Sequence, residues 1–123
     1  MSDAERSARG PGGGADVLRA WSAGGPEPDR VTRKAAVKES LAELARRAPG
    51  HSVEVRVPPF GAVQCVEGPR HTRGTPPNVV ETDPRTWIGL ALGVLNWDDA
   101  VASGTVRASG GRAGEIGPLL PLA

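Results

Sequence analysis

Three basic side chains stand close together in one segment of the sequence, and their chemistry suits anion binding. Arg70, His71 and Arg73 lie among glycines and prolines in residues 68–77, and Arg85 follows shortly after. A guanidinium presents several N–H donors in a fork that matches a carboxylate or a phosphate. We therefore expect either an anion-binding loop or, as the alternative, a solvated loop in an arginine-rich protein.

The sequence lacks the residue patterns of common catalytic sites. No serine stands in the G-x-S-x-G pattern of a hydrolase elbow. The only lysines, Lys34 and Lys38, fall in a predicted helix and do not complete a phosphate-binding loop. We therefore predict that the protein is not an enzyme and has no catalytic residue.

The residues that bind metals are scattered along the chain. His51, Cys65 and His71 are single residues without the paired spacing of a zinc site. Asp98 and Asp99 are adjacent at the start of a predicted helix, where negative charge complements the helix dipole. We predict no metal and no cofactor.

Length and charge exclude several classes of protein. The chain has 123 residues, a net charge of +1 and one cysteine, so neither a nucleic-acid partner nor a disulfide framework is expected. Its most apolar stretch, residues 87–95, is much shorter than the roughly 20 residues that cross a bilayer. The first residues also lack the apolar core of a signal peptide. We therefore expect no integral membrane association and a cytoplasmic location.

The first 28 residues differ in composition from the rest of the chain. They are rich in glycine and proline, and their one apolar cluster is Val17, Leu18 and Trp21. So few apolar side chains do not offset the entropy lost when such a segment is ordered. We expect residues 1–28 to form a disordered tail, with a short docked helix over residues 16–23 as the alternative, and residues 29–123 to form the folded domain.

The helices and strands of the domain must position any functional side chain. The hydrophobic pattern of the sequence predicts where these helices and strands lie. Residues 31–48 have one apolar helical stripe, and residues 84–93 and 96–104 have helix caps at both ends. Short, mostly alternating segments predict strands at 52–57, 62–66, 78–82 and 105–109. Helices that lie between strands of a mostly antiparallel sheet indicate an α+β fold with the helices on one face.

Residues 83–110 resemble the C-terminal half of sterol-carrier-protein-like domains. The resemblance rests on three segments: Asp83-Pro84-Arg85-Thr86-Trp87, then Gly93 to Ala100, then Gly104 to Gly110. Residues 53–58 and 70–83 are similar to the bacterial, actinobacterial-type branch of that family. The resemblance covers roughly residues 31–122. It implies a five-stranded sheet, an apolar cavity between helices and sheet, and carriage of lipids without catalysis.

The candidate ligand-lining residues are the apolar side chains of the helix layer and of the strands that face it. They are Val55, Val57, Val63, Cys65, Trp87, Leu90, Leu95, Trp97 and Val101. We expect them first to form the core, together with Val53, and only secondly to line a cavity. The polar end of a ligand is expected near Arg70, Arg73 or Arg85.

The expected function is therefore non-catalytic binding or carriage of a lipid-like apolar ligand, such as a fatty acid, an acyl-CoA or a sterol. The expected partner is an apolar small molecule. The alternative is a protein-interaction or helper module whose cavity is filled or vestigial. For that alternative the sequence identifies no protein partner.

Overall fold

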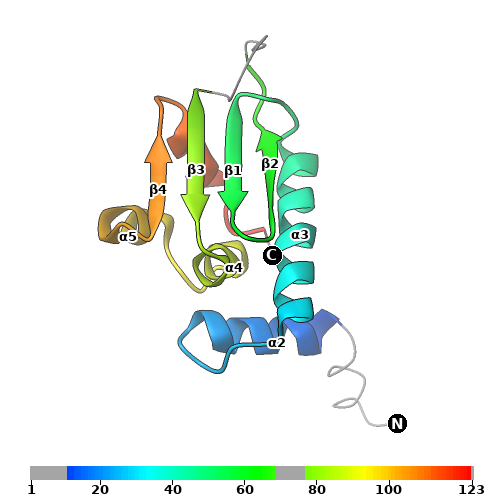
Figure 1. Ribbon diagram of the computed structural model, residues 1–123. Coiled ribbons are helices and arrows are strands. Elements are labelled where there is room, and N and C mark those ends of the chain that lie inside the picture. The colour runs from blue at the N-terminus through cyan, green and yellow to red at the C-terminus, as the bar shows by residue number, and fades with distance from the viewer. Residues whose placement is uncertain (1–10, 69–76, 123) are drawn as a thin grey trace.

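The structure is a computed structural model that describes residues 11–68 and 77–122. The described elements, in chain order, are α2 (Pro11–Ser22), α3 (Arg30–Arg47), β1 (Val53–Val57), β2 (Gly61–Cys65), β3 (Asn78–Thr82), α4 (Pro84–Leu92), α5 (Trp97–Ser103), β4 (Val106–Ser109) and the 3-10 helix η1 (Ala113–Leu119). Figure 1 shows α3 beside the sheet, α4 and α5 at one end of the strands, and α2 beyond α4. The fold class is α+β, as predicted.

In the part of the chain that the structure describes, the sheet has four strands in the order β2-β1-β3-β4. Strand β1 pairs antiparallel with β2, with Val55 opposite Val63, and parallel with β3, with Val55 opposite Val80. Strand β4 pairs antiparallel with β3. Strand β3 lies on the side of β1 opposite β2 and runs in the same direction as β1 (Figure 1).

The expectation of a five-stranded, mostly antiparallel sheet is therefore wrong in strand number, and the sheet is mixed. The sequence has four strand-like segments, and the fifth strand was implied only by the family resemblance. In the described residues after β4, the chain forms η1 instead of another strand.

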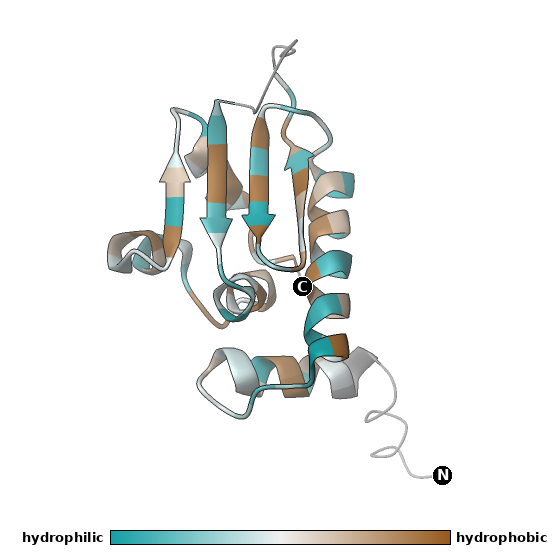
Figure 2. Cartoon of the chain, in the orientation of Figure 1, coloured by the Kyte–Doolittle hydropathy of each residue, from teal (hydrophilic) through white to brown (hydrophobic). Residues whose placement is uncertain are grey.

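The alternation of residues along the strands gives the sheet one buried and one open face. Val53, Val55 and Val57 are fully buried, while Glu54 and Arg56 point to the other face and form an ion pair. The alternating brown and teal of β1 in Figure 2 follow this pattern. The helices therefore cover one face, as predicted.

Polar side chains set the starts of three helices. The Asp29 carboxylate accepts a hydrogen bond of 2.8 Å from the Thr32 N–H and begins α3. Asp83 does the same for the Thr86 N–H at the start of α4, and Asn96 for the Asp99 N–H at the start of α5. Helices α4 and α5 end at Gly93 and Gly104, whose positive φ angles of 80° and 83° suit glycine. The predicted helices are therefore present, with ends shifted by at most about two residues.

The N-terminal segment differs from the expected disordered tail. Residues 11–22 form α2, which packs on α4 and buries Trp21 and Ser22. The docked-helix alternative is thus the better description of residues 16–22, while residues 1–10 lie outside the described part. The docked helix is stabilised because one buried indole contributes much more apolar contact than a composition average suggests.

None of the helices in residues 11–68 and 77–122 is long and apolar enough to span a bilayer.

Candidate functional site

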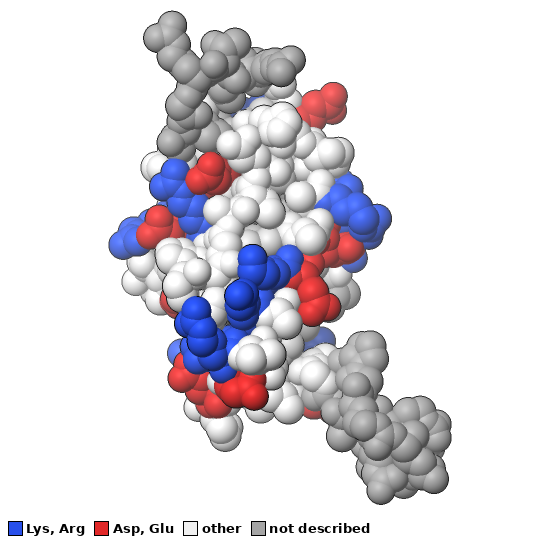
Figure 3. All heavy atoms as spheres, turned by 45° about the vertical axis from the view of Figure 1, so that its right-hand side comes forward, with Lys and Arg blue, Asp and Glu red and all other residues white. Residues whose placement is uncertain are grey.

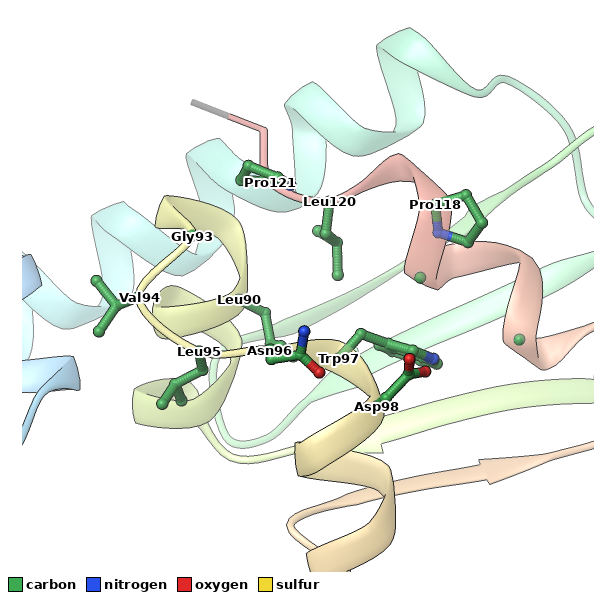
Figure 4. Close-up of a pocket in the computed structure, with 12 residues that line it drawn as sticks. Leu90, Gly93, Val94, Leu95, Asn96, Trp97, Asp98, Pro118, Leu120 and Pro121 are labelled. Atoms are coloured by element: carbon green, nitrogen blue, oxygen red, sulfur yellow. The ribbon is translucent and has the colours of Figure 1, made fainter.

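A surface groove lies where the α4–α5 connection meets the C-terminal segment, and we call it the C-terminal groove. Its volume is about 660 Å³. The lining residues are Leu90, Gly93, Val94, Leu95, Asn96, Trp97, Asp98, Gly114, Gly117, Pro118, Leu120 and Pro121. Figure 4 shows the side chains of Leu120 and Trp97 on facing sides of this space. The groove is built from helix ends and the C-terminal segment, and not from the sheet.

Trp97 is the largest side chain of the groove, and Gly117 determines where its indole ring lies. A methyl group on residue 117 would come within 2.7 Å of the ring's Cδ1 and 2.9 Å of its Nε1. Non-bonded carbon atoms pack at about 3.5–4.0 Å, so this ring position requires glycine at 117. Trp97 therefore joins the start of α5 to η1 and is only partly buried.

The C-terminal segment is fixed to α4 by its backbone and by one buried side chain. The Leu122 N–H donates a hydrogen bond of 2.8 Å to the Ala91 carbonyl oxygen, and the Leu122 side chain is buried. Pro121 lies close to Gly93, at 3.4 Å from where a Cβ on that glycine would be. The two contacts hold Leu120 in place as a wall of the groove.

The side chains of the groove carry no positive charge. The Asn96 side-chain oxygen is used as the helix cap of α5, at 3.0 Å from the Asp99 nitrogen. Asp98 is the one charged residue in the lining given above, and it is negative. A carboxylate accepts hydrogen bonds from a hydroxyl group and repels an anion. The arrangement therefore suits a neutral apolar molecule with a hydroxyl group better than an anionic lipid.

The structure brings three of the nine candidate lining residues together in this groove: Leu90, Leu95 and Trp97. Four others, Val55, Val57, Cys65 and Trp87, are completely buried in the core. Because these four side chains expose no surface, no space of the size of a water molecule lies against them. Val63 is partly buried against the same core, and Val101 is 38% exposed on α5. The predicted core is thus largely observed, and around these four residues the space between helices and sheet is filled.

Of the candidate residues for the polar end, the structure describes Arg85, and it does not place Arg85 beside the groove. Arg85 lies at the start of α4, whereas the groove is at the other end of that helix, and the Arg85 Nε donates a 3.0 Å hydrogen bond to the Trp21 carbonyl oxygen. Arg70 and Arg73 lie outside the described residues.

Sequence reasoning missed the half of the groove that comes from the C-terminal segment. Gly114, Gly117, Pro118, Leu120 and Pro121 belong to this half. The signal available was the apolar, proline-containing run at residues 118–122, which is too short and too irregular to be assigned to a helix or strand by periodicity.

Metal binding has no support from the described residues. Among them, no three His, Cys, Asp or Glu side chains are grouped so that they could hold an ion. Cys65 is buried in the core, and burial raises the pKa of its thiol to about 11, which disfavours the thiolate that would act as a metal ligand or nucleophile.

Comparison with known proteins agrees with the family resemblance drawn from the sequence. The family model described as bacterial SCP ortholog matches residues 29–122, and no curated protein matches the chain significantly. The match begins at the residue that caps α3 and includes every element from α3 to η1. The chain therefore belongs to the bacterial SCP ortholog family, and these residues form its sterol carrier protein-like domain.

Proposed function

We propose that this protein binds and carries a neutral, lipid-like apolar molecule in the C-terminal groove, without catalysing a reaction on it. The observation that carries this proposal is the partly buried indole of Trp97, held open to the groove by Gly117 beside Leu90, Leu95 and Leu120. The family, whose members are generally non-catalytic lipid carriers, supports the same conclusion.

The size of the groove supports a ligand of the lipid class. Its volume of about 660 Å³ falls within the roughly 300–1,000 Å³ of small-molecule sites. Ligand sites use a few polar groups to fix orientation, and in this groove the side chains of Asn96 and Asp98 are available for that. Of the three classes predicted from the sequence, a sterol fits best, because a fatty acid and an acyl-CoA would both bring negative charge towards Asp98.

A titration with dehydroergosterol, a fluorescent neutral sterol, tests the proposal. We expect the sterol to quench tryptophan emission, mainly that of Trp97, because Trp97 is the tryptophan in the lining given for the groove. Palmitate and palmitoyl-CoA in parallel titrations should bind at least tenfold more weakly. If emission does not change with any of the three ligands up to their solubility, and native mass spectrometry finds no bound lipid, the proposal is wrong.

Two leucine substitutions locate the binding site. Gly114 lines the groove with open space around it, so Gly114→Leu should occupy the groove and weaken sterol binding at least tenfold. Gly111 also has open space around it but does not line the groove, so Gly111→Leu is the matched control. Equal affinities of the two variants would place the ligand elsewhere.

The alternative is a protein-interaction or helper module, and the filled space around Val55, Val57, Cys65 and Trp87 favours it. Under this alternative the groove receives an apolar segment of a protein. One stoichiometric protein partner whose binding is lost in Gly114→Leu, together with flat lipid titrations, would support it over the carrier. The cytoplasmic location and the absence of a nucleic-acid partner stay predictions from the sequence.

A further inference from the structure

Helix α2 lies before the family-matched residues, yet it is packed closely on the domain. The family model begins at residue 29, whereas α2 ends at Ser22. Trp21 is 5% exposed and Ser22 is fully buried, and α2 packs against α4 (Figure 1). The Arg85 Nε adds a hydrogen bond to the Trp21 carbonyl at the C-terminal end of α2, where a positive charge complements the helix dipole.

At Gly89, this contact comes close to Leu95, which lines the C-terminal groove. A Cβ on residue 89 would lie 2.5 Å from Leu95 Cδ1 and 3.2 Å from Ser22 Cβ. Leu95 lines the groove and Ser22 belongs to α2. Both side chains therefore pack against the α4 backbone at Gly89, where there is no side chain. The backbone of Leu95 is also fixed there, because its N–H donates a 3.0 Å hydrogen bond to the Gly89 carbonyl oxygen.

We infer that α2 is part of the binding site: Ser22 and Gly89 are positioning residues that hold Leu95 as a wall of the C-terminal groove. Docked α2 limits the rotamers of Leu95, so the groove is formed before a ligand arrives. This inference rests on the proposed function. It adds that residues outside the family-matched domain determine the ligand affinity of this chain.

Helix α2 needs this contact for its own stability. Its first turns contain Gly12, Gly13 and Gly14, and a glycine in a helix is about 1 kcal/mol less favourable than an alanine. An isolated helix of 12 residues is marginal even with good helix formers. Helix formation and docking are therefore coupled, and a ligand that prefers the docked state must stabilise α2 in return, since linkage is reciprocal.

Hydrogen exchange of the full chain, with and without dehydroergosterol, tests the inference. We expect saturating sterol to slow exchange of the α2 amides at least threefold, although α2 contributes none of the lining residues given for the groove. If the sterol binds and exchange in α2 does not change, the inference is wrong while the proposed function stands.

Three variants extend the test. Trp21→Ala removes the buried side chain of α2 and should weaken sterol binding about tenfold. Arg85→Ala removes only the hydrogen bond to the Trp21 carbonyl, keeps the core intact, and should speed exchange in α2 about three- to tenfold. Val17 is on α2 but 48% exposed, so Val17→Ala is the matched control and should change neither quantity. Sterol affinity in Trp21→Ala equal to that of Val17→Ala would overturn the inference.

An NMR measurement on the free protein tests the positioning role of α2 independently of the proposed function. In the free protein, the methyl NMR signals of Leu95 should shift in Trp21→Ala and stay unchanged in Val17→Ala. Shifted signals in a protein that binds no sterol would support the positioning role and reject the proposed function. Unshifted signals would reject the positioning role whatever the protein binds.

Discussion

The indole Nε1 of Trp87 donates a hydrogen bond of 2.8 Å to the Ser40 Oγ, and this bond joins α4 to α3 inside the molecule. Trp87 is fully buried. The Ser40 hydroxyl accepts from the indole and lies 2.7 Å from the Ala36 carbonyl oxygen, to which it donates. A buried N–H without a partner is costly, so this bond determines which rotamer of Trp87 the core accepts.

The first prediction concerns this bond. Ser40→Ala should lower the free energy of unfolding by about 1–3 kcal/mol, because the buried indole N–H loses its acceptor. Trp87→Ala should cost about 3–5 kcal/mol, because it leaves a cavity in a small core. Urea denaturation measures both changes. Ser103→Ala removes a hydroxyl whose hydrogen bonds are to α5 and the adjacent loop, and it is the control with little expected change.

The second prediction concerns the wall of the groove. Gly117→Ala should displace the Trp97 indole, since its Cδ1 lies 2.7 Å from the new methyl position, and should shift tryptophan emission to longer wavelength. Gly114→Ala is the control in the same 3-10 helix, because open space surrounds its Cβ position. Emission spectra of the two variants that match each other would contradict the contact.

The third prediction concerns the thiol of Cys65. Burial raises its pKa to about 11, so at pH 8 the folded protein holds very little thiolate, and the reagent has no access to it. We expect Ellman's reagent to label Cys65 only as fast as the protein opens, with the rate rising in step with unfolding by urea. Rapid labelling of the folded protein would mean that β2, which contains Cys65, is accessible to the reagent.

The fourth prediction concerns the pH dependence of stability. Hydrogen bonds from Arg46, which has the larger effect, and from Arg47 lower the pKa of the Glu43 carboxyl to about 2, from an ordinary value of 4.5. A carboxyl with a lowered pKa stabilises the fold fully above about pH 4.5, and the contribution is lost as the pH falls from there towards about 2. When the pH is lowered through this range, the free energy of unfolding of Glu43→Gln should therefore fall less than that of the wild type, as measured by thermal unfolding.

Glu39→Gln is the control for that experiment. It removes one negative charge from the same helix without touching the contacts of Glu43 with Arg46 and Arg47. The acid-induced loss of stability should stay close to that of the wild type in this variant. A direct NMR titration of Glu43 that gives a pKa near 4.5 would contradict the role of the two arginines.

The charges on α3 have mixed signs, and Figure 3 shows Lys and Arg side chains close to acidic ones on the side of the molecule where this helix comes forward. The helix thus has a solvated face with local ion pairs, such as those of Glu43. This agrees with the net charge of +1, from which no nucleic-acid partner was expected.

The local elements were determined by the sequence itself. Asp83-Pro84 and Gly93 fixed the ends of α4, and the alternation of Val53, Val55 and Val57 fixed the buried face of β1. Caps and periodicity act over a few residues, so they can be recognised in one short stretch. The same short-range information identified the family through residues 83–110, and the match over residues 29–122 confirmed it.

Contacts between distant residues were decided only by the tertiary structure. Composition suggested a disordered tail because it cannot show that Trp21 meets α4, some 60 residues later in the chain. Likewise, Leu90, Leu95 and Trp97 form a groove only because Gly117 and Leu120 return beside them, whereas Val55, Val57 and Trp87 pack into the core. An apolar residue type is compatible with core and groove alike, and the choice between them depends on which distant backbone approaches it.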